Sequence, residues 1–364
     1  MVNRVIIGWD IGGANTKASL IEFSGDRIAN TKSILRYFPI WLEGKERLPE
    51  VLRELKEELT AGKEVDGVAV TMTAELSDAY YTKREGVNHI LDSVRIAFQE
   101  RDYLIRVVDV DARLRTIEDS RMDPLKVAAA NWSATAWLVA RHMKDTILVD
   151  TGSTTTDIIP IKDGDIAALG KTDPDRLVSG ELVFTGALRT PIPAIVRTLT
   201  YHGRPCRVSS EKFALSADVH LVLGHITEDE YTCDTSDGRG TGRRDSLARI
   251  ARTICADTEM LTEEEIGDLA RKVYDGQLED IAGGLSQVAE RLQIARQSRK
   301  AFPITVAGLG RSFLASEAAR RAGFTKIISI EDFLDARSAV IAPSAAAAIM
   351  LNAELLSEQG RKKA

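Results

Sequence analysis

Hydrophobic and polar residues change their spacing along the chain in a way that predicts alternating strands and helices. Apolar, β-branched residues dominate 4–11, and a second apolar stretch at 17–23 follows a glycine-containing turn, which is typical of a β-hairpin. Residues 48–59 place apolar side chains at helical spacing with charges between them. A strand over 65–73, a helix over 87–100, a strand over 105–110 and a helix over 124–143 follow. This order predicts an α/β fold.

The opening pattern of an apolar run, an aspartate and a glycine turn returns at residues 146–157. We therefore expect two related lobes, 1–145 and 146–364. Proline and loop residues make 171–245 irregular, which indicates an inserted or substrate-facing portion. Further helices are predicted over 245–258, 262–274 and 277–299, and a third glycine turn follows a strand at 304–307. An alanine-rich helix over 343–357 completes the pattern.

The two glycine turns carry the candidate chemistry. A strand-end aspartate, Asp10 or Asp150, precedes each turn, and Lys17 follows the first one. Glycine lets backbone N–H groups approach an anion closely, and a strand-end carboxylate can hold a divalent cation through water. The expected anion cradle consists of Gly12, Gly13, Asn15, Thr16, Gly152, Ser153, Thr154 and Thr155. The alternative is that these are ordinary hairpin turns capped by aspartate and that Lys17 is a surface lysine.

Composition limits the classes of function. The chain has 364 residues and a net charge of −6, with 48 basic and 54 acidic residues interspersed. This balance disfavours binding to nucleic acid or to an anionic membrane surface. No apolar run approaches the roughly 20 residues needed to span a bilayer, and three well-separated cysteines fit a reducing compartment. We expect a cytoplasmic protein that acts on small-molecule substrates. The protein could assemble as a homo-oligomer.

The order of these elements resembles the actin, Hsp70 and sugar-kinase superfamily. The resemblance rests on the first turn, the strand at 65–73, the second turn, the glycine turn at 307–314 and the final helix. It implies a duplicated actin-like ATPase fold of the ribonuclease H-like α/β class, with two lobes around a central cleft. In that superfamily the turn at 307–314 corresponds to the adenosine side of the site.

Shorter runs are similar to the hydantoinase A and oxoprolinase group, and within it to an archaeal branch linked to methanofuran biosynthesis. They lie at 70–77, 83–86, 129–132, 150–157, 180–183 and 188–191. The resemblance implies a transferase in which the phenol of γ-glutamyltyramine attacks an (aminomethyl)furanmethyl diphosphate. The products would be an aryl ether and pyrophosphate. Diphosphate chemistry leads us to infer Mg²⁺, and ATP is not expected to be required.

The resemblance also extends the set of candidate residues. It implies that the catalytic residues are Asp10, Lys17, Asp111 and Asp150, of which Asp10 and Asp150 hold the metal. It implies that the substrate-binding residues include Thr71, Thr73, Asn131, Arg189, Gly308 and Gly310. Glu75 ends the same strand as the two threonines. Either Asp109 or Asp111 would deprotonate the phenol, unless both are turn carboxylates, and Arg189 would bind the glutamyl carboxylate, unless it forms a structural salt bridge.

Two other classes of function stay open. Gly308 and Gly310 favour an ATP-dependent kinase or a hydantoinase- or oxoprolinase-type hydrolase, since they resemble an adenosine-side turn. A nucleotide-dependent clamp without enzymatic activity is the third reading. The sequence lacks the long peptide-binding β-domain that such a clamp would need.

Overall fold

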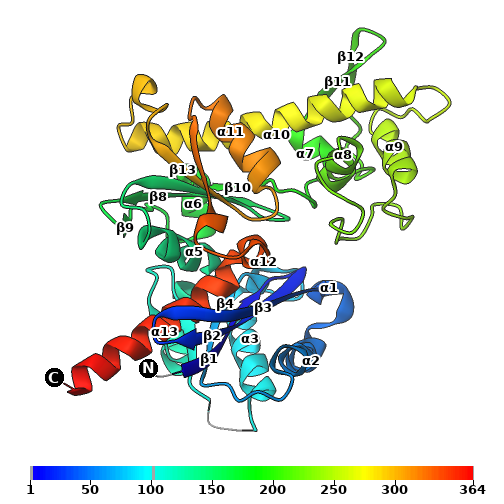
Figure 1. Cartoon of the computed structure of the whole chain (residues 1–364). Helices are drawn as coiled ribbons and strands as arrows, with labels where there is room; N and C mark the ends of the chain where they lie inside the picture. Colours follow the sequence, from blue (N-terminus) through cyan, green and yellow to red (C-terminus); the bar gives the residue numbers. More distant parts are fainter. Residues whose placement is uncertain (1–2, 101–102, 364) are drawn as a thin grey trace. The chain divides into compact units, whose positions relative to one another are not determined.

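The computed structural model describes residues 3–100 and 103–363, which divide into two compact units (Figure 1). The first unit runs to Asp145 and also contains Ile161–Asp175 and the chain from Ile330 onward. The second unit consists of Thr146–Pro160 and Arg176–Ser329. The chain passes from the first unit to the second after Asp145, and two segments within 146–364, the range predicted as the second lobe, group with the first unit.

The first unit is built on a six-stranded sheet with the order β3-β2-β1-β4-β5-β6. β1 pairs antiparallel with β2 and parallel with β4, which in turn pairs parallel with β5. The strands are β1 (Asn3–Ile11), β2 (Asn15–Ser24), β3 (Arg27–Tyr37), β4 (Gly67–Met72), β5 (Ile105–Val108) and β6 (Leu114–Arg115). All six residues of β4 are buried, as expected for a central strand covered on both faces.

Helices cover both faces of this sheet. They are α1 (Ile40–Glu43), α2 (Leu48–Thr60), α3 (Lys83–Ala97), α4 (Ile117–Met122), α5 (Asn131–Ala140), α12 (Ala336–Val340) and α13 (Ala342–Lys363). Side chains of α2 and α3 share one hydrophobic core with β1 and β4, including Trp9, Leu52, Val70 and Ile90. The predicted helix at 124–143 is shorter in the structure, because a single 3₁₀ turn, Pro124–Lys126, is separated from α5.

The C-terminal helix α13 explains why the chain end belongs to the first unit. It packs against β1, β2, β4 and α5. A methyl group at Gly8 of β1 would lie only 1.8 Å from the carbonyl oxygen of Ser344, so the helix backbone approaches the strand at a glycine. The hydroxyl of Ser344 also lies 2.9 Å from that of Ser19 on β2. Such close backbone approach requires the absence of a side chain at residue 8.

The second unit repeats the strand arrangement of the first. Its sheet has the order β10-β8-β7-β13-β14, with β9 paired to β8. The strands of this sheet are β7 (Thr146–Thr151), β8 (Thr156–Lys162), β10 (Leu182–Val183), β13 (Pro303–Ala307) and β14 (Lys326–Ser329), together with β9 (Asp165–Ile166), which lies in a segment that groups with the first unit. β13 pairs parallel with both β7 and β14. In each unit a strand–turn–strand segment therefore leads into two parallel strands, which is the predicted duplication.

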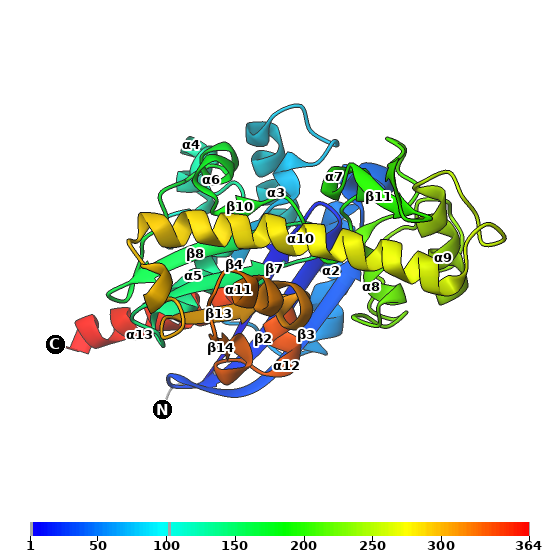
Figure 2. The ribbon, with the colours of Figure 1, turned by 90° about the horizontal axis from the view of Figure 1, so that it is seen from above.

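Helices and one small hairpin complete the second unit. The helices are α6 (Asp173–Ser179), α7 (Ile192–Ile195), α8 (Ser216–Val222), α9 (Arg243–Arg252), α10 (Glu263–Arg291) and α11 (Ser316–Arg321), and the hairpin pairs β11 (Thr198–Tyr201) with β12 (Arg204–Arg207). Figure 2 shows α10 running along the unit past β8 and β10. The region predicted as an irregular insertion contains α7, α8 and the hairpin.

Helix α10 is one helix of 29 residues where the sequence predicted two. Its N-terminus has the predicted capping box between Thr262 and Glu265. Two glycines of this helix lie close to neighbouring side chains: a methyl group at Gly284 would lie 2.7 Å from Val183, and one at Gly276 would lie 2.9 Å from Val196. Glycine has a low helix propensity, but the helix continues through both positions because neighbouring side chains pack where a side chain at these positions would otherwise be.

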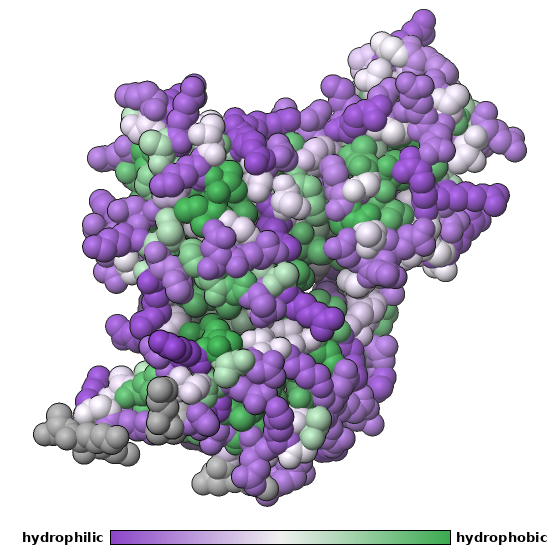
Figure 3. Space-filling model, viewed as in Figure 1, coloured by the Kyte–Doolittle hydropathy of each residue, from purple (hydrophilic) through white to green (hydrophobic). Residues whose placement is uncertain are grey.

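Hydrophilic side chains cover the outer edges of each unit on the face shown in Figure 3, while hydrophobic side chains show in smaller areas. Among the helices that the structure describes, none is both long and apolar enough to cross a membrane.

Candidate active site

The first glycine turn joins β1 to β2. The N–H of Gly12 donates to the carbonyl of Asn15 at 3.0 Å, which closes the turn. The carbonyls of Gly13 and Ala14 accept hydrogen bonds from Ile40 and Phe38. Within 3–100 and 103–363, the N–H groups of Gly13 and Ala14 have no hydrogen-bond acceptor. The turn is therefore held through its carbonyls, and two successive N–H donors remain available to an anion.

Lys17, Asp10 and Thr71 form a row across three adjacent strands. Asp10 is in register with Lys17 on β2 and with Thr71 on β4. Its Oδ2 lies 3.0 Å from Nζ of Lys17, and its side chain is 1% exposed. Oδ1 of Asp10 and Oγ1 of Thr71 are buried and have no hydrogen-bond partner in the described part of the chain. Buried polar atoms of this kind are normally satisfied, so a water, ion or ligand oxygen fits here.

Two further predicted residues lie beside the same turn. Oδ1 of Asn15 and Oγ1 of Thr16 are buried and likewise have no hydrogen-bond partner among the described residues. Thr73 follows β4, and its N–H donates to the carbonyl of Ile11 at 2.9 Å. A methyl group at Gly12 would lie 3.4 Å from Oγ1 of Thr73. The structure thus brings together all the predicted cradle residues of the first unit.

The second glycine turn, between β7 and β8, has the same hydrogen-bond plan. The N–H of Gly152 donates to the carbonyl of Thr155 at 2.9 Å. The carbonyl of Ser153 accepts from the N–H groups of Leu188 and Arg189. In the described ranges, the N–H groups of Ser153 and Thr154 have no acceptor. Both turns therefore present a pair of successive N–H donors just after a strand-end aspartate.

Three glycines outside the turn hold Asp150 and the second turn in place. A methyl group at Gly308 would lie 2.4 Å from the carbonyl oxygen of Thr151 and 2.5 Å from Oδ1 of Asp150. One at Gly310 would lie 2.6 Å from the side chain of Thr151, to whose carbonyl the N–H of Gly310 donates. Gly308 therefore packs directly on the aspartate and Gly310 on the neighbouring Thr151, which gives both glycines a role that needs no adenosine.

Gly186 is the third of these glycines, and the sequence prediction missed it. A methyl group there would lie 2.6 Å from the backbone nitrogen and carbonyl carbon of Thr154. The amide of Gln277 on α10 donates to Oγ1 of Thr185 at 2.8 Å and to the carbonyl of Gly186 at 3.0 Å. No local pattern marks either residue, because their contacts join segments far apart in the sequence.

Asp109 and Asp111, the predicted bases, are both engaged in charged contacts. Oδ1 of Asp109 accepts from the N–H groups of Asp111 and Arg113, and Oδ2 accepts from Arg115 at 2.7 Å. Asp111 lies 2.9 Å from Lys171 and 3.1 Å from Lys126. Hydrogen bonds first from Lys171 and then from Lys126 lower the pKa of Asp111. A carboxylate held in this way is a weak proton acceptor.

Asn131 begins α5, and its Oδ1 accepts the N–H of Trp132 at 2.9 Å. Arg189 directs its backbone N–H to the second glycine turn, as described above. These contacts place Asn131 in the first unit and Arg189 beside Ser153 in the second. Their predicted roles in substrate binding stay predictions.

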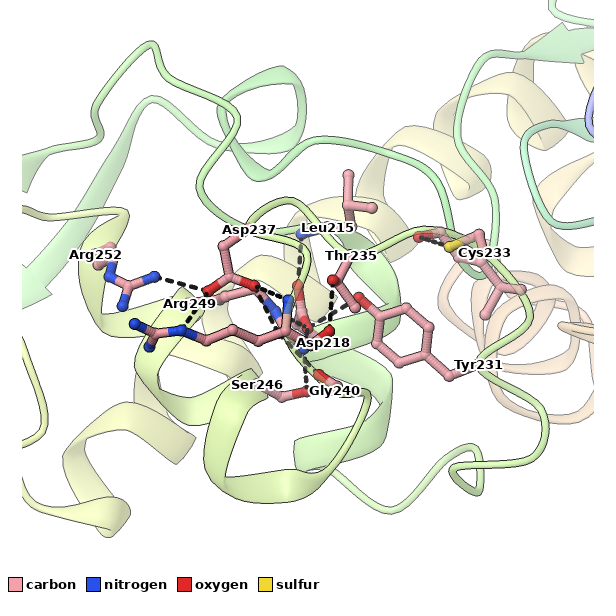
Figure 4. Close-up of polar contacts among 12 residues, drawn as sticks. Leu215, Asp218, Tyr231, Cys233, Thr235, Asp237, Gly240, Ser246, Arg249 and Arg252 are labelled. Carbon is pink, nitrogen blue, oxygen red and sulfur yellow. Dashed lines mark hydrogen bonds and ion pairs between the residues drawn. The ribbon is translucent and has the colours of Figure 1, made fainter. Parts of the chain in front are cut away.

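A buried charge network supports the segment around Arg189 (Figure 4). Arg249 and Asp218 are both fully buried and lie 2.8 Å apart, and Arg249 also contacts Asp237 at 3.1 Å. The hydroxyl of Tyr231 donates to Asp218 at 3.0 Å. Cys233, close to Tyr231 in sequence, donates through Sγ to the carbonyl of Leu188 at 3.8 Å. The network therefore fixes a loop that is tied to the residues next to the second turn.

Comparisons with known proteins show the family to which the chain belongs. A sequence profile of the family described as Hydantoinase/oxoprolinase matches residues 66–353. A protein of Methanocaldococcus jannaschii is 41% identical over 96% of this chain and 98% of its own length. A protein of Methanococcus vannielii is 37% identical over 60% of this chain and 96% of its own length. Both carry the name (4-{4-[2-(gamma-L-glutamylamino)ethyl]phenoxymethyl}furan-2-yl)methanamine synthase.

A solved structure supports the fold. The nucleotide-free structure of acetone carboxylase matches with a TM-score of 0.57 at 12% identity, over 90% of this chain and 68% of that one. At this identity the likeness concerns the fold alone. Together with the repeated sheet order, it confirms the predicted actin-like α/β fold.

Proposed function

Because the chain belongs to the hydantoinase/oxoprolinase family and its similar relatives are named as synthases, it is an enzyme, and we propose that it forms an aryl ether. The substrates are an (aminomethyl)furanmethyl diphosphate and the phenol of γ-glutamyltyramine, and pyrophosphate is the second product. The relatives' name describes such a molecule, in which a phenoxymethyl group joins a glutamylated aminoethyl arm to a furan that carries a methanamine. The identity of 41% over almost the full length of both chains carries this proposal.

The glycine turns suit the leaving group. Breaking the bond between carbon and diphosphate oxygen moves negative charge onto the diphosphate. Preorganised N–H donors stabilise such developing charge without reorganisation during the reaction. Gly13 and Ala14 in one unit, and Ser153 and Thr154 in the other, have N–H groups of the required kind. Lys17, beside Asp10, adds a positive charge at the first turn.

A divalent cation fits the same residues. Oδ1 of Asp10 is buried without a hydrogen-bond partner in the described part of the chain. Mg²⁺ prefers one or two carboxylates together with phosphate oxygens and waters. Asp10 in the first unit is thus a candidate to hold the ion through water, and Asp150 keeps the corresponding predicted role in the second unit. When bound, the ion would neutralise charge on the diphosphate.

The electron-rich furan removes the need for a covalent nucleophile of the protein. Its ring can stabilise positive charge on the methylene carbon while the diphosphate departs. The phenol oxygen then bonds to that carbon. The chain's own residues accordingly have to bind the leaving group, orient the phenol and accept its proton.

The test is to incubate the purified protein with Mg²⁺ and both substrates, with and without ATP, and to follow ether, pyrophosphate and ADP. We expect equal amounts of ether and pyrophosphate without ATP. Formation of ADP with no pyrophosphate from the furan substrate would instead support an ATP-dependent kinase or hydrolase. The packing of Gly308 and Gly310 against Asp150 and Thr151 weakens the observation that favoured that alternative.

A further inference from the structure

Glu75 is a buried carboxylate close to the first glycine turn. It lies in the 3₁₀ turn Ala74–Leu76, directly after β4, and is 1% exposed. A methyl group at Gly13 would lie 3.4 Å from Cβ of Ser77 and 3.9 Å from Cα of Ala74. The segment that carries Glu75 therefore packs on the turn whose N–H groups are available to an anion.

Glu75 is also packed from the other side. A methyl group at Gly86 of α3 would lie 2.5 Å from Cα of Glu75, so the helix approaches at a glycine. The backbone N–H of Ala129, just before α5, acts on the carboxylate and lowers its pKa. Ala129 has a φ of 50°, an uncommon conformation for a residue other than glycine. Glu75 thus lies between the first glycine turn and the start of the helix that carries Asn131.

The charges around Glu75 leave it without an ion pair. Neither carboxylate oxygen has a hydrogen-bond partner among the residues described. The nearest cation, Lys83 of α3, is bound to Asp173 at 2.5 Å. Burial raises the pKa of Glu75 to about 7, an effect that Lys83 and the backbone N–H groups of Glu75 and Ala129 oppose and that Asp173 reinforces. Tyr80, which Glu75 also influences, has its hydroxyl 2.8 Å from His89.

Three other carboxylates near the predicted sites have cationic partners, unlike Glu75. Asp10 faces Lys17, Asp109 faces Arg115, and Asp111 faces two lysines. A base must take up a proton and then release it, which a strong ion pair opposes.

We propose that Glu75 is the general base that accepts the phenol proton, an inference that rests on the proposed ether-forming function. The O–H bond of the phenol breaks and its proton passes to a carboxylate oxygen of Glu75. The phenol oxygen forms a bond to the furan methylene carbon, while the carbon–oxygen bond to diphosphate breaks and its electron pair leaves with the pyrophosphate. Glu75 then releases the proton to water.

The test compares the wild-type protein with Glu75→Gln, using γ-glutamyltyramine and ring-fluorinated analogues whose phenols ionise more readily. An exposed carboxylate variant of the same unit, Glu118→Gln, is the control. General-base catalysis contributes about 10²–10⁴-fold, so Glu75→Gln should lose roughly that factor with the ordinary phenol. Fluorinated phenols and higher pH should restore most of it, because these phenols need less help from a base. The control should match the wild type with every phenol.

Several results would overturn the inference. One is a Glu75→Gln rate equal to that of the wild type, and another is an equal loss with ordinary and fluorinated phenols, which would indicate a structural role. A third requires only the wild-type protein. Its rate with the ordinary phenol should fall as pH drops through about 7, and an unchanged rate there would contradict the proposal. If the wild type makes no ether from any phenol, the ether-forming function itself fails.

Discussion

Replacement of Gly308 by alanine tests whether the glycine turn after β13 exists to support Asp150. Gly308 has a φ of +82°, and the new methyl group would lie 2.4 Å from the carbonyl oxygen of Thr151 and 2.5 Å from Oδ1 of Asp150. One neighbour is backbone and the other is the carboxylate of the predicted metal site, so the contact cannot be relieved by moving a flexible side chain. We expect Asp150 or its strand end to shift.

The structure permits an estimate of the cost. A left-handed conformation costs a residue with Cβ roughly 1–2 kcal/mol, and overpacking typically adds about 1–3 kcal/mol. Gly308→Ala should therefore lower the free energy of unfolding by about 2–5 kcal/mol. Gly203→Ala is the matched control, since Gly203 has a φ of +74° and no atom within 4 Å of the added methyl group. That variant should lose only the conformational part, roughly 1–2 kcal/mol.

Urea unfolding and ether-forming activity would be measured on both variants. We expect Gly308→Ala to be less stable than Gly203→Ala and to lose most of its activity under conditions where it is still folded. The control should retain activity. If the two variants lost equal stability and Gly308→Ala kept full activity, the close approach to Asp150 would have no functional consequence.

Other predictions concern single contacts. Asp150→Asn should greatly lower turnover without changing the urea midpoint by much, and an unchanged rate would remove this aspartate from the mechanism. Lys17→Met should raise the KM for the diphosphate substrate about 10- to 100-fold, which corresponds to the loss of a charged hydrogen bond. An unchanged KM would contradict a role for Lys17 in binding the diphosphate. Arg249→Met should cost about 3–5 kcal/mol in urea unfolding, because it leaves Asp218 buried without its cation; a loss below 1 kcal/mol would refute this. In the folded protein the pKa of Glu75 is raised from 4.5 to about 7. The free energy of unfolding of the wild type, measured against that of Glu75→Gln, should therefore be highest below pH 4.5 and fall by about 3 kcal/mol as the pH rises to 7. A difference that does not change with pH would contradict the raised pKa.

Local patterns predicted much of the first unit and both glycine turns. The turn after Asp10 and the one after Asp150 depend on residues that are neighbours in sequence, so their shared plan was visible before the structure. The sequence predicted a hairpin in which Lys17 follows the turn, and the structure places its Nζ 3.0 Å from Asp10. Hairpin pairing fixes both relationships, because residues across a turn are set in register by the turn itself.

Contacts between distant segments could not be predicted in this way. Gly186 looks like any loop glycine until Thr154 is placed against it. Asp111 looked like a suitable base until Lys171, from a segment that returns to the first unit, was found beside it. Helix α10 continues through Gly276 because tertiary packing outweighs helix propensity.

The central claim is that the phenol oxygen displaces diphosphate from the furan methylene carbon. The most direct measurement uses γ-glutamyltyramine labelled with ¹⁸O in its phenol, incubated with the furanmethyl diphosphate and Mg²⁺ in the absence of ATP. Mass spectrometry should find the label in the ether and unlabelled pyrophosphate in equal amount. Absence of ether without ATP, or appearance of the label in released phosphate, would contradict the account.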